Sequence, residues 1–284
     1  MKKQQLILAS VGLVVLALLM IFGKTVEKKG KAPTETAKQN NLPSFDITKY
    51  ETEARQKLTP GQSAYLAKLE NSISRGDVKD QQFKVYNQLA SFWKDSLHNH
   101  ELHVFYVSKA AKLVNSEKNL TFAARQILDD LRNEGNLAIR SWKAEEAISL
   151  FEKAIEQNPA KDSLKVELAS CYIFGKGMAG NAEETMKGIQ QLLQIVKKDS
   201  TNMEAQLALG IGGVISTQYD KAVSRLETVV KNEPMNIEAL SWLADAYAAK
   251  GDKPNALKYY EITKRMVNNP VYTKEVDERI KLLK

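Results

Sequence analysis

The sequence has a single cysteine, Cys171, in 284 residues, so no disulfide can form within the chain. Cys171 lies in an apolar run, residues 168–174, that contains no basic group to activate a thiol, and we predict that it packs in a core. Glycine and proline are scarce, at 14 and 7 residues, whereas 43% of the chain is hydrophobic. This balance is typical of an all-helical protein.

Patterns typical of catalytic sites are also missing. No Ser/His/Asp order, no pair of carboxylates on one helical face and no P-loop is apparent. Residues 175–180 read GKGMAG and match the G-x-G-x-x-G pattern of dinucleotide-binding loops, but that loop needs a preceding strand, and no strand is evident. We interpret this segment as an enlarged turn between two helices. The sequence therefore predicts neither an enzyme nor a cofactor.

Most of the chain lacks the basic excess that its formal net charge of +7 suggests. Residues 1–41 hold seven lysines and two glutamates, a charge of +5, which leaves only +2 for the remaining 243 residues. Nucleic-acid-binding proteins usually concentrate positive charge on their folded surface. We therefore predict no nucleic-acid partner.

One long stretch, from Gln4 to Gly23, contains no charged residue. As a helix, these 20 residues would extend about 30 Å, the thickness of the hydrocarbon core of a bilayer. Lys2 and Lys3 precede the stretch, as in a secretory signal, but its apolar run exceeds the about 7–15 residues of a cleaved signal, and no small-x-small cleavage site comes after it. We predict that residues 1–24 form an uncleaved transmembrane anchor.

The orientation of this anchor has two interpretations. Four lysines come directly after the span and outnumber the charges before it, and the positive-inside rule would keep the C-terminal part of the chain in the cytoplasm. A short Lys-Lys head before an apolar run resembles instead a bacterial signal-anchor, which exports the C-terminal part of its chain. We expect a single-pass protein of a bacterial inner membrane with a periplasmic soluble domain, and a cytoplasmic-facing domain is the alternative.

Two consecutive 34-residue units, 203–236 and 237–270, match each other position by position. Leu209-Gly210 in the first unit aligns with Leu243-Ala244 in the second. Each unit carries two apolar stripes with a period near 3.6, separated by a short turn. A fixed period of this size indicates a repeat protein in which each unit is a helical hairpin, and the hairpins stack to bury their stripes.

These units resemble the tetratricopeptide repeat (TPR) family. The first helix has the large–small pair, the second has a small residue four positions before an aromatic (Ala256 and Tyr260), and Pro234 lies where the first unit ends. Gly213 and Thr263 depart from the family pattern, which usually has an aromatic and an alanine there. The resemblance implies an all-α, right-handed solenoid of helix-turn-helix repeats.

Weaker units extend this pattern toward the N-terminus, and the second of them contains extra sequence around residues 134–143. In the region that leads into the repeats, Thr59, Pro60 and Gln62 form a capping-box pattern that predicts a helix start. The predicted segments are a transmembrane anchor (1–24), a flexible tether (25–42), a helical lead-in region (43–79), a repeat domain (80–270, with units 82–118, 119–161, 162–202, 203–236 and 237–270) and a C-terminal capping helix (271–284).

The resemblance also implies a concave groove lined by fixed positions of the first helix of each unit. The lysine, asparagine and arginine residues with which family members clamp a carboxylate are missing from these positions. An apolar middle and a mildly acidic C-terminal end favour an apolar or basic segment as ligand. Packing between repeats, or residues 43–75, could instead cover the same side chains. The candidate groove residues are Val166, Ser170, Ile173, Phe174, Leu207, Ile211, Val214, Ile215, Ser241 and Asp245.

The predicted function is that of a membrane-tethered scaffold that binds a protein or peptide partner without catalysis and concentrates it at the bilayer. A self-associating assembly subunit, a homo-oligomer, is the first alternative. The second is metal binding, because His98, His100 and His103 lie within six residues of one another. His98 and His100 lack the i, i+4 spacing that places two ligands on one helical face, so no metal is predicted.

Overall fold

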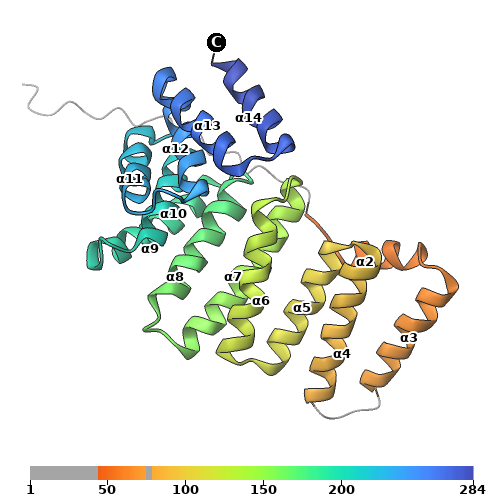
Figure 1. Cartoon of the computed structure of the whole chain (residues 1–284). Coiled ribbons are helices and arrows are strands. Elements are labelled where there is room, and N and C mark those ends of the chain that lie inside the picture. Colours follow the sequence, from red (N-terminus) through yellow and green to blue (C-terminus); the bar gives the residue numbers. More distant parts are fainter. Residues whose placement is uncertain (1–43, 75–78, 284) are drawn as a thin grey trace, which may run out of the picture. The chain divides into compact units, whose positions relative to one another are not determined.

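The computed structural model describes residues 44–74 and 79–283, and all regular structure within them is helical (Figure 1). The predicted anchor, 1–24, and tether, 25–42, lie outside the described residues. In the part of the chain that is described, none of the helices combines the length and hydrophobicity needed to cross a bilayer. The expected all-helical fold is confirmed for these residues. The helices are α2 (Ile47–Gln56), α3 (Pro60–Ser74), α4 (Lys79–Ser91), α5 (His100–Val114), α6 (Glu117–Arg132), α7 (Leu137–Gln157), α8 (Asp162–Ser170), α9 (Ala182–Lys198), α10 (Met203–Ile215), α11 (Tyr219–Asn232), α12 (Ile237–Lys250), α13 (Lys253–Val267) and α14 (Pro270–Leu282), with two π-helical segments, η1 (Phe92–Ser96) and η2 (Cys171–Gly177), continuing α4 and α8.

Asparagine caps set the starts of several helices. Asn181, Asn202 and Asn236 precede α9, α10 and α12, and each accepts a hydrogen bond from the backbone N–H three residues further on. These side chains satisfy donors that a helix leaves unpaired in its first turn. Thr59 and Gln62 form the reciprocal capping box predicted at the start of α3. The helix boundaries are therefore encoded locally.

The helices pack as consecutive hairpins, α4 with α5, α6 with α7, η2 and α8 with α9, α10 with α11, and α12 with α13 (Figure 1). Each hairpin then packs on the next, so that apolar side chains from both helices become buried, among them Leu164, Leu192, Leu226 and Leu243. Burial of these stripes between neighbours is the main source of stability in a stacked-repeat fold.

Further helices cover both ends of the stack. At the N-terminal end, α3 packs on α4 through the buried Leu66 and Leu69, while α2 lies against α5. The ring of Phe45, just before α2, contacts Trp142 of α7 at a centroid distance of 5.1 Å. At the other end, Val276 and Ile280 of α14 are buried against the last hairpin.

Replacement of Gly188 by alanine tests the close approach of α8 and α9. A Cβ atom at Gly188 would lie 2.7 Å from the carbonyl oxygen of Ala169, a backbone atom that cannot rotate away. We expect Gly188→Ala to lower the free energy of unfolding by about 1–3 kcal/mol, measured by urea denaturation followed by circular dichroism. In the matched control Gly61→Ala no atom lies within 4 Å of the new Cβ, and we expect unchanged or slightly higher stability. Equal stability of the two variants would contradict this packing.

Candidate functional site

Half of the predicted groove residues belong to the core. Val166, Ile173 and Ile211 have no exposed surface, and the hydroxyl of Ser170 donates to the carbonyl oxygen of Val166 at 2.9 Å. Phe174 is 3% exposed. Packing between repeats therefore covers this part of the predicted groove, which is one of the two alternatives that the sequence leaves open. Residues 44–58 pack elsewhere, with Phe45 on α7 and α2 on α5.

At the C-terminal end of the predicted groove, α14 occupies the polar positions. The Tyr272 hydroxyl lies 2.8 Å from the hydroxyl of Ser241. Asp245 forms an ion pair with Arg279 at 2.8 Å and also accepts a hydrogen bond from Tyr260. The acidic character expected of this end is thus neutralised by the chain's own arginine. The predicted residues that keep partial exposure are Leu207, Val214, Ile215, Ser241 and Asp245.

Two arginines of α6 extend across the first helices of the later hairpins. Arg125 forms an ion pair with Glu167 of α8 at 2.6 Å. Arg132 forms an ion pair with Glu238 at the start of α12, and its guanidinium lies 4.7 Å from the centroid of the Phe174 ring. These contacts link helices that are far apart in the sequence. They place two long basic side chains of α6 against the side of the stack that α8, η2 and α12 form.

Between α4 and α6 the structure is open, with α5 as the floor. A cavity of about 230 Å³ lies between the three helices, and a second of about 340 Å³ continues it toward the C-terminal end of α6. The two cavities share the lining residues His103, Val107 and Gln126, so they adjoin and follow one row along α6. We call this row the α4–α6 cleft and define it by Phe83, Asn87, His103, Phe122, Gln126 and Asp129.

Sequence reasoning missed the α4–α6 cleft because it lies between the two least regular repeats. Its floor is built from small side chains, Ala110 and Ala111 of α5 and Ala123 of α6, and these leave depth between the helices. The signal that could have found it is Phe122, a large apolar residue outside the stripe of α6 that the core buries. Phe122 is 64% exposed in the structure.

The three histidines do not converge on one point. His98 adopts a left-handed backbone conformation, with φ of 51°, in the turn before α5, and His100 Nδ1 lies 3.5 Å from Asp130. His103 Nδ1 lies 3.1 Å from the carbonyl oxygen of Ala90, and its Nε2 lies 3.3 Å from the side-chain amide of Gln126. Burial lowers the pKa of His103, so its ring is neutral at pH 7. Over residues 44–74 and 79–283, no group of three or more His, Cys, Asp or Glu side chains is placed to hold a metal ion.

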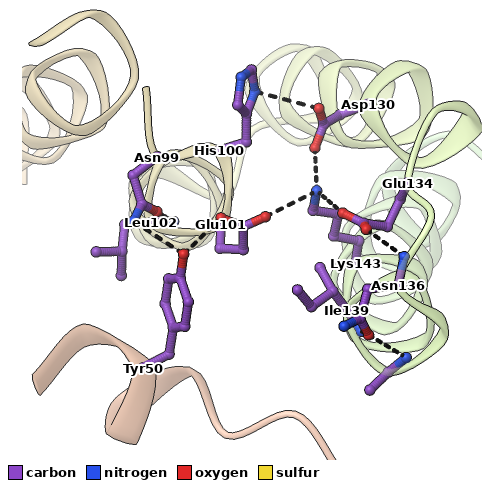
Figure 2. Close-up of polar contacts among 11 residues, drawn as sticks. Tyr50, Asn99, His100, Glu101, Leu102, Asp130, Glu134, Asn136, Ile139 and Lys143 are labelled. Carbon is purple, nitrogen blue, oxygen red and sulfur yellow. Dashed lines mark hydrogen bonds and ion pairs between the residues drawn. The ribbon is translucent and has the colours of Figure 1, made fainter. Parts of the chain in front are cut away.

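A buried lysine pairs with Asp130, which lines one end of the cleft, and Figure 2 shows the polar contacts around this lysine. Lys143 of α7 is 2% exposed and forms ion pairs with Asp130 at 2.6 Å, Glu134 at 2.7 Å and Glu101 at 3.7 Å. Burial alone lowers the pKa of this ammonium group, but hydrogen bonds to Asp130 and Glu134 outweigh that effect and raise the pKa. The Tyr50 hydroxyl donates to Glu101 at 3.0 Å and brings α2 into the same network. The lysine therefore connects α5, α6 and α7 through charges and α2 through Glu101.

The remaining sequence patterns have structural roles. Cys171 is fully buried, which raises the pKa of its thiol and disfavours the reactive thiolate. Residues 175–180 form the end of η2 and the turn before α9. The N–H of Asn181, the cap of α9, donates to the carbonyl oxygen of Lys176 and closes this turn.

Comparisons with known proteins agree with this architecture. Residues 216–268 match the tetratricopeptide repeat family. No curated protein matches the chain. A TPR protein of Thermus thermophilus, TTC0263, is 15% identical in sequence and matches 72% of this chain and 98% of its own, with a TM-score of 0.51. The MamA protein is 18% identical and matches 66% of this chain and 92% of its own, with a TM-score of 0.42. YrrB, described as a TPR protein with an unusual peptide-binding site, is 16% identical and matches 74% of this chain and 97% of its own, also with a TM-score of 0.42. Residues 216–268 thus carry TPR sequence, and the chain has a TPR-like solenoid fold.

The variant Lys143→Met tests the buried lysine. It removes the cation that separates three carboxylates, and we expect the free energy of unfolding at pH 8 to fall by about 3 kcal/mol. The variant also removes the hydrogen bond and the charge with which Lys143 lowers the pKa of Glu134, so part of this loss should be recovered at pH 5, where protonation relieves the repulsion.

Lys112→Met is the matched control, because Lys112 pairs with Glu146 at 2.7 Å on a partly exposed face. Loss of that pair should cost less than about 1 kcal/mol and should not be recovered at low pH. The assigned role of Lys143 is wrong if both variants show the same loss at pH 8.

Proposed function

We propose that this chain is a non-catalytic scaffold, held at a membrane by residues 1–24, that binds a segment of a protein partner on the side formed by the first helices of its hairpins. TPR repeats generally mediate protein–protein interactions, and residues 216–268 match that family. The observation that carries the proposal is the α4–α6 cleft, a depression with apolar and polar walls between the first helices of the first two hairpins. Mixed linings of this kind are typical of sites that bind peptide segments.

The membrane part of the proposal rests on the uncharged stretch from Gln4 to Gly23 and its lysine flanks. We place the protein in a bacterial inner membrane with the repeats in the periplasm, and the cytoplasm remains the alternative side. Anchoring would restrict the scaffold to the bilayer surface and raise the effective concentration of its partner there.

Self-association is the second candidate, and exposed apolar side chains at the C-terminal end favour it. Val271 and Leu282 of α14 are 79% and 87% exposed. A second copy of the chain could cover them, although the outer face of α14 also carries charged residues such as Lys274 and Glu278.

Site-specific photo-crosslinking of the full-length chain in its native membranes tests the scaffold proposal. A photoreactive residue at Gln126, in the cleft, should crosslink to a different protein, identified by mass spectrometry. A photoreactive residue at Lys258, exposed on α13 and outside the cleft, should not capture that protein.

A third position separates the two candidates. If only copies of this chain are captured, and most strongly from Val271, the chain is an assembly subunit and the scaffold proposal fails. If the chain is released from membranes by sodium carbonate, the proposed anchor is wrong.

A further inference from the structure

The α4–α6 cleft differs along its length, and its first end is apolar. Phe122 of α6, 64% exposed, and Phe83 of α4 both line the cavity of about 230 Å³, above a floor that includes Val107 and Ala110. The volume is below that of pockets that hold a whole drug-sized ligand, so it suits one side chain. An aromatic side chain could pack against both phenylalanine rings and gain the stabilisation of aromatic pairs.

Amide groups line the apolar cavity beside the two phenylalanines. Asn87 donates its Nδ2 to the carbonyl oxygen of Phe83 at 2.8 Å, which leaves its own oxygen free to accept. Among the described residues, the side-chain amide of Asn119 has no hydrogen-bond partner. Each amide offers both a donor and an acceptor, and an extended peptide main chain presents the complementary groups. A bound helix has already paired its main-chain groups, so these amides favour an extended segment.

The second end of the cleft is acidic. Asp129 is exposed at this end, and Asp130 belongs to the lysine network behind it. Lys94 lines this end together with the two aspartates, and Lys143, Glu101 and Glu134 lie behind Asp130, so these six residues carry a summed formal charge of −2. Charge complementarity favours a lysine or arginine of the ligand here, and it contributes to specificity more than to affinity.

The distance between the two ends sets the spacing of the ligand. Phe122 and Asp129 are seven residues apart on α6, which corresponds to about 10 Å along the helix axis. An extended peptide in the polyproline II conformation covers that distance in about three residues, and its three residues per turn place the side chains of i and i+3 on one face. We propose that the α4–α6 cleft binds an extended segment of a partner protein that carries an aromatic residue and, three positions away, a lysine or arginine. This proposal rests on the proposed function, since it names the class of partner segment.

The chain's own residues 25–42 do not match this description of the ligand. They are basic but contain no aromatic residue, so they lack the apolar anchor.

Fluorescence polarisation with synthetic peptides and the full-length chain in detergent tests this proposal. The probe is a labelled peptide with the sequence Gly-Ser-Phe-Ser-Ser-Lys-Ser-Gly, used together with the reversed order, because the direction of the ligand in the cleft is open. Control peptides replace the phenylalanine by alanine or the lysine by glutamate. We expect at least one of the two orders to bind about tenfold more tightly than its controls.

Variants of the protein identify the site. Phe122→Ala should weaken probe binding about tenfold or more, because it removes the exposed anchor. Asp129→Lys should reverse the charge preference, so that the peptide with glutamate binds better than the peptide with lysine. Leu193→Ala is the control, since Leu193 is 42% exposed on α9, outside the cleft, and its removal should leave binding unchanged. Loss of fold cannot produce the reversal of preference expected for Asp129→Lys.

Two results would overturn the proposal. One is the absence of binding for both peptide orders, and the other is binding that Phe122→Ala and Asp129→Lys leave unchanged. If the crosslink from Gln126 still captures a partner in either case, the scaffold function stands and only the class of segment is wrong. If that crosslink captures nothing, the scaffold function fails as well.

Discussion

No helical hairpin of this chain can bury the apolar stripes on both of its helices, and stacking against the next hairpin removes them from water. This constraint decides which surfaces remain for binding. In the hairpins that begin with α8 and α10 it buries part of the inner faces of the first helices, so that Val166, Ile173 and Ile211 lie in the core. Two further elements complete the closure, the arginines of α6 and the capping helix α14, whose Arg279 pairs with Asp245. The depression between α4 and α6 lies outside this closed face.

The buried Lys143 explains how two hairpins can be braced while a cleft stays open beside them. Charges taken out of water are costly unless each finds partners, and here one ammonium group is surrounded by three carboxylates from α5, α6 and the turn before α7. Removal of one member of such a network is costly, because it leaves an uncompensated charge in the interior. The extra sequence around residues 134–143, which makes the second repeat irregular, supplies two members of this network, Glu134 and Lys143.

The helical fold and the stacking of repeats could be predicted because they depend on local signals. Each of these signals extends over a few turns of helix. They are the periodic apolar stripes within residues 203–270, the capping box at Thr59 and the apolar run around Cys171. Exposure of the groove residues could not be predicted, because it depends on how closely neighbouring hairpins approach. The positions that line the groove in the TPR family indicate which side chains point inward. The contact between Arg132 and Glu238, however, joins residues 106 positions apart, and no repeat period in the sequence encodes it. The cleft could not be predicted either, because it lies between the two least regular repeats.

The inner face is largely buried in the later hairpins and open as a cleft in the first two, and two phenylalanines report this contrast directly. Phe122 of α6 is 64% exposed, and Phe174 of η2 is 3% exposed. Hydroxyl-radical footprinting of the native full-length chain, read by mass spectrometry, measures the oxidation rates of both rings in one sample. The structure predicts rapid oxidation of Phe122 and strong protection of Phe174. Equal rates in the folded protein, or protection of Phe122 alone, would contradict the account.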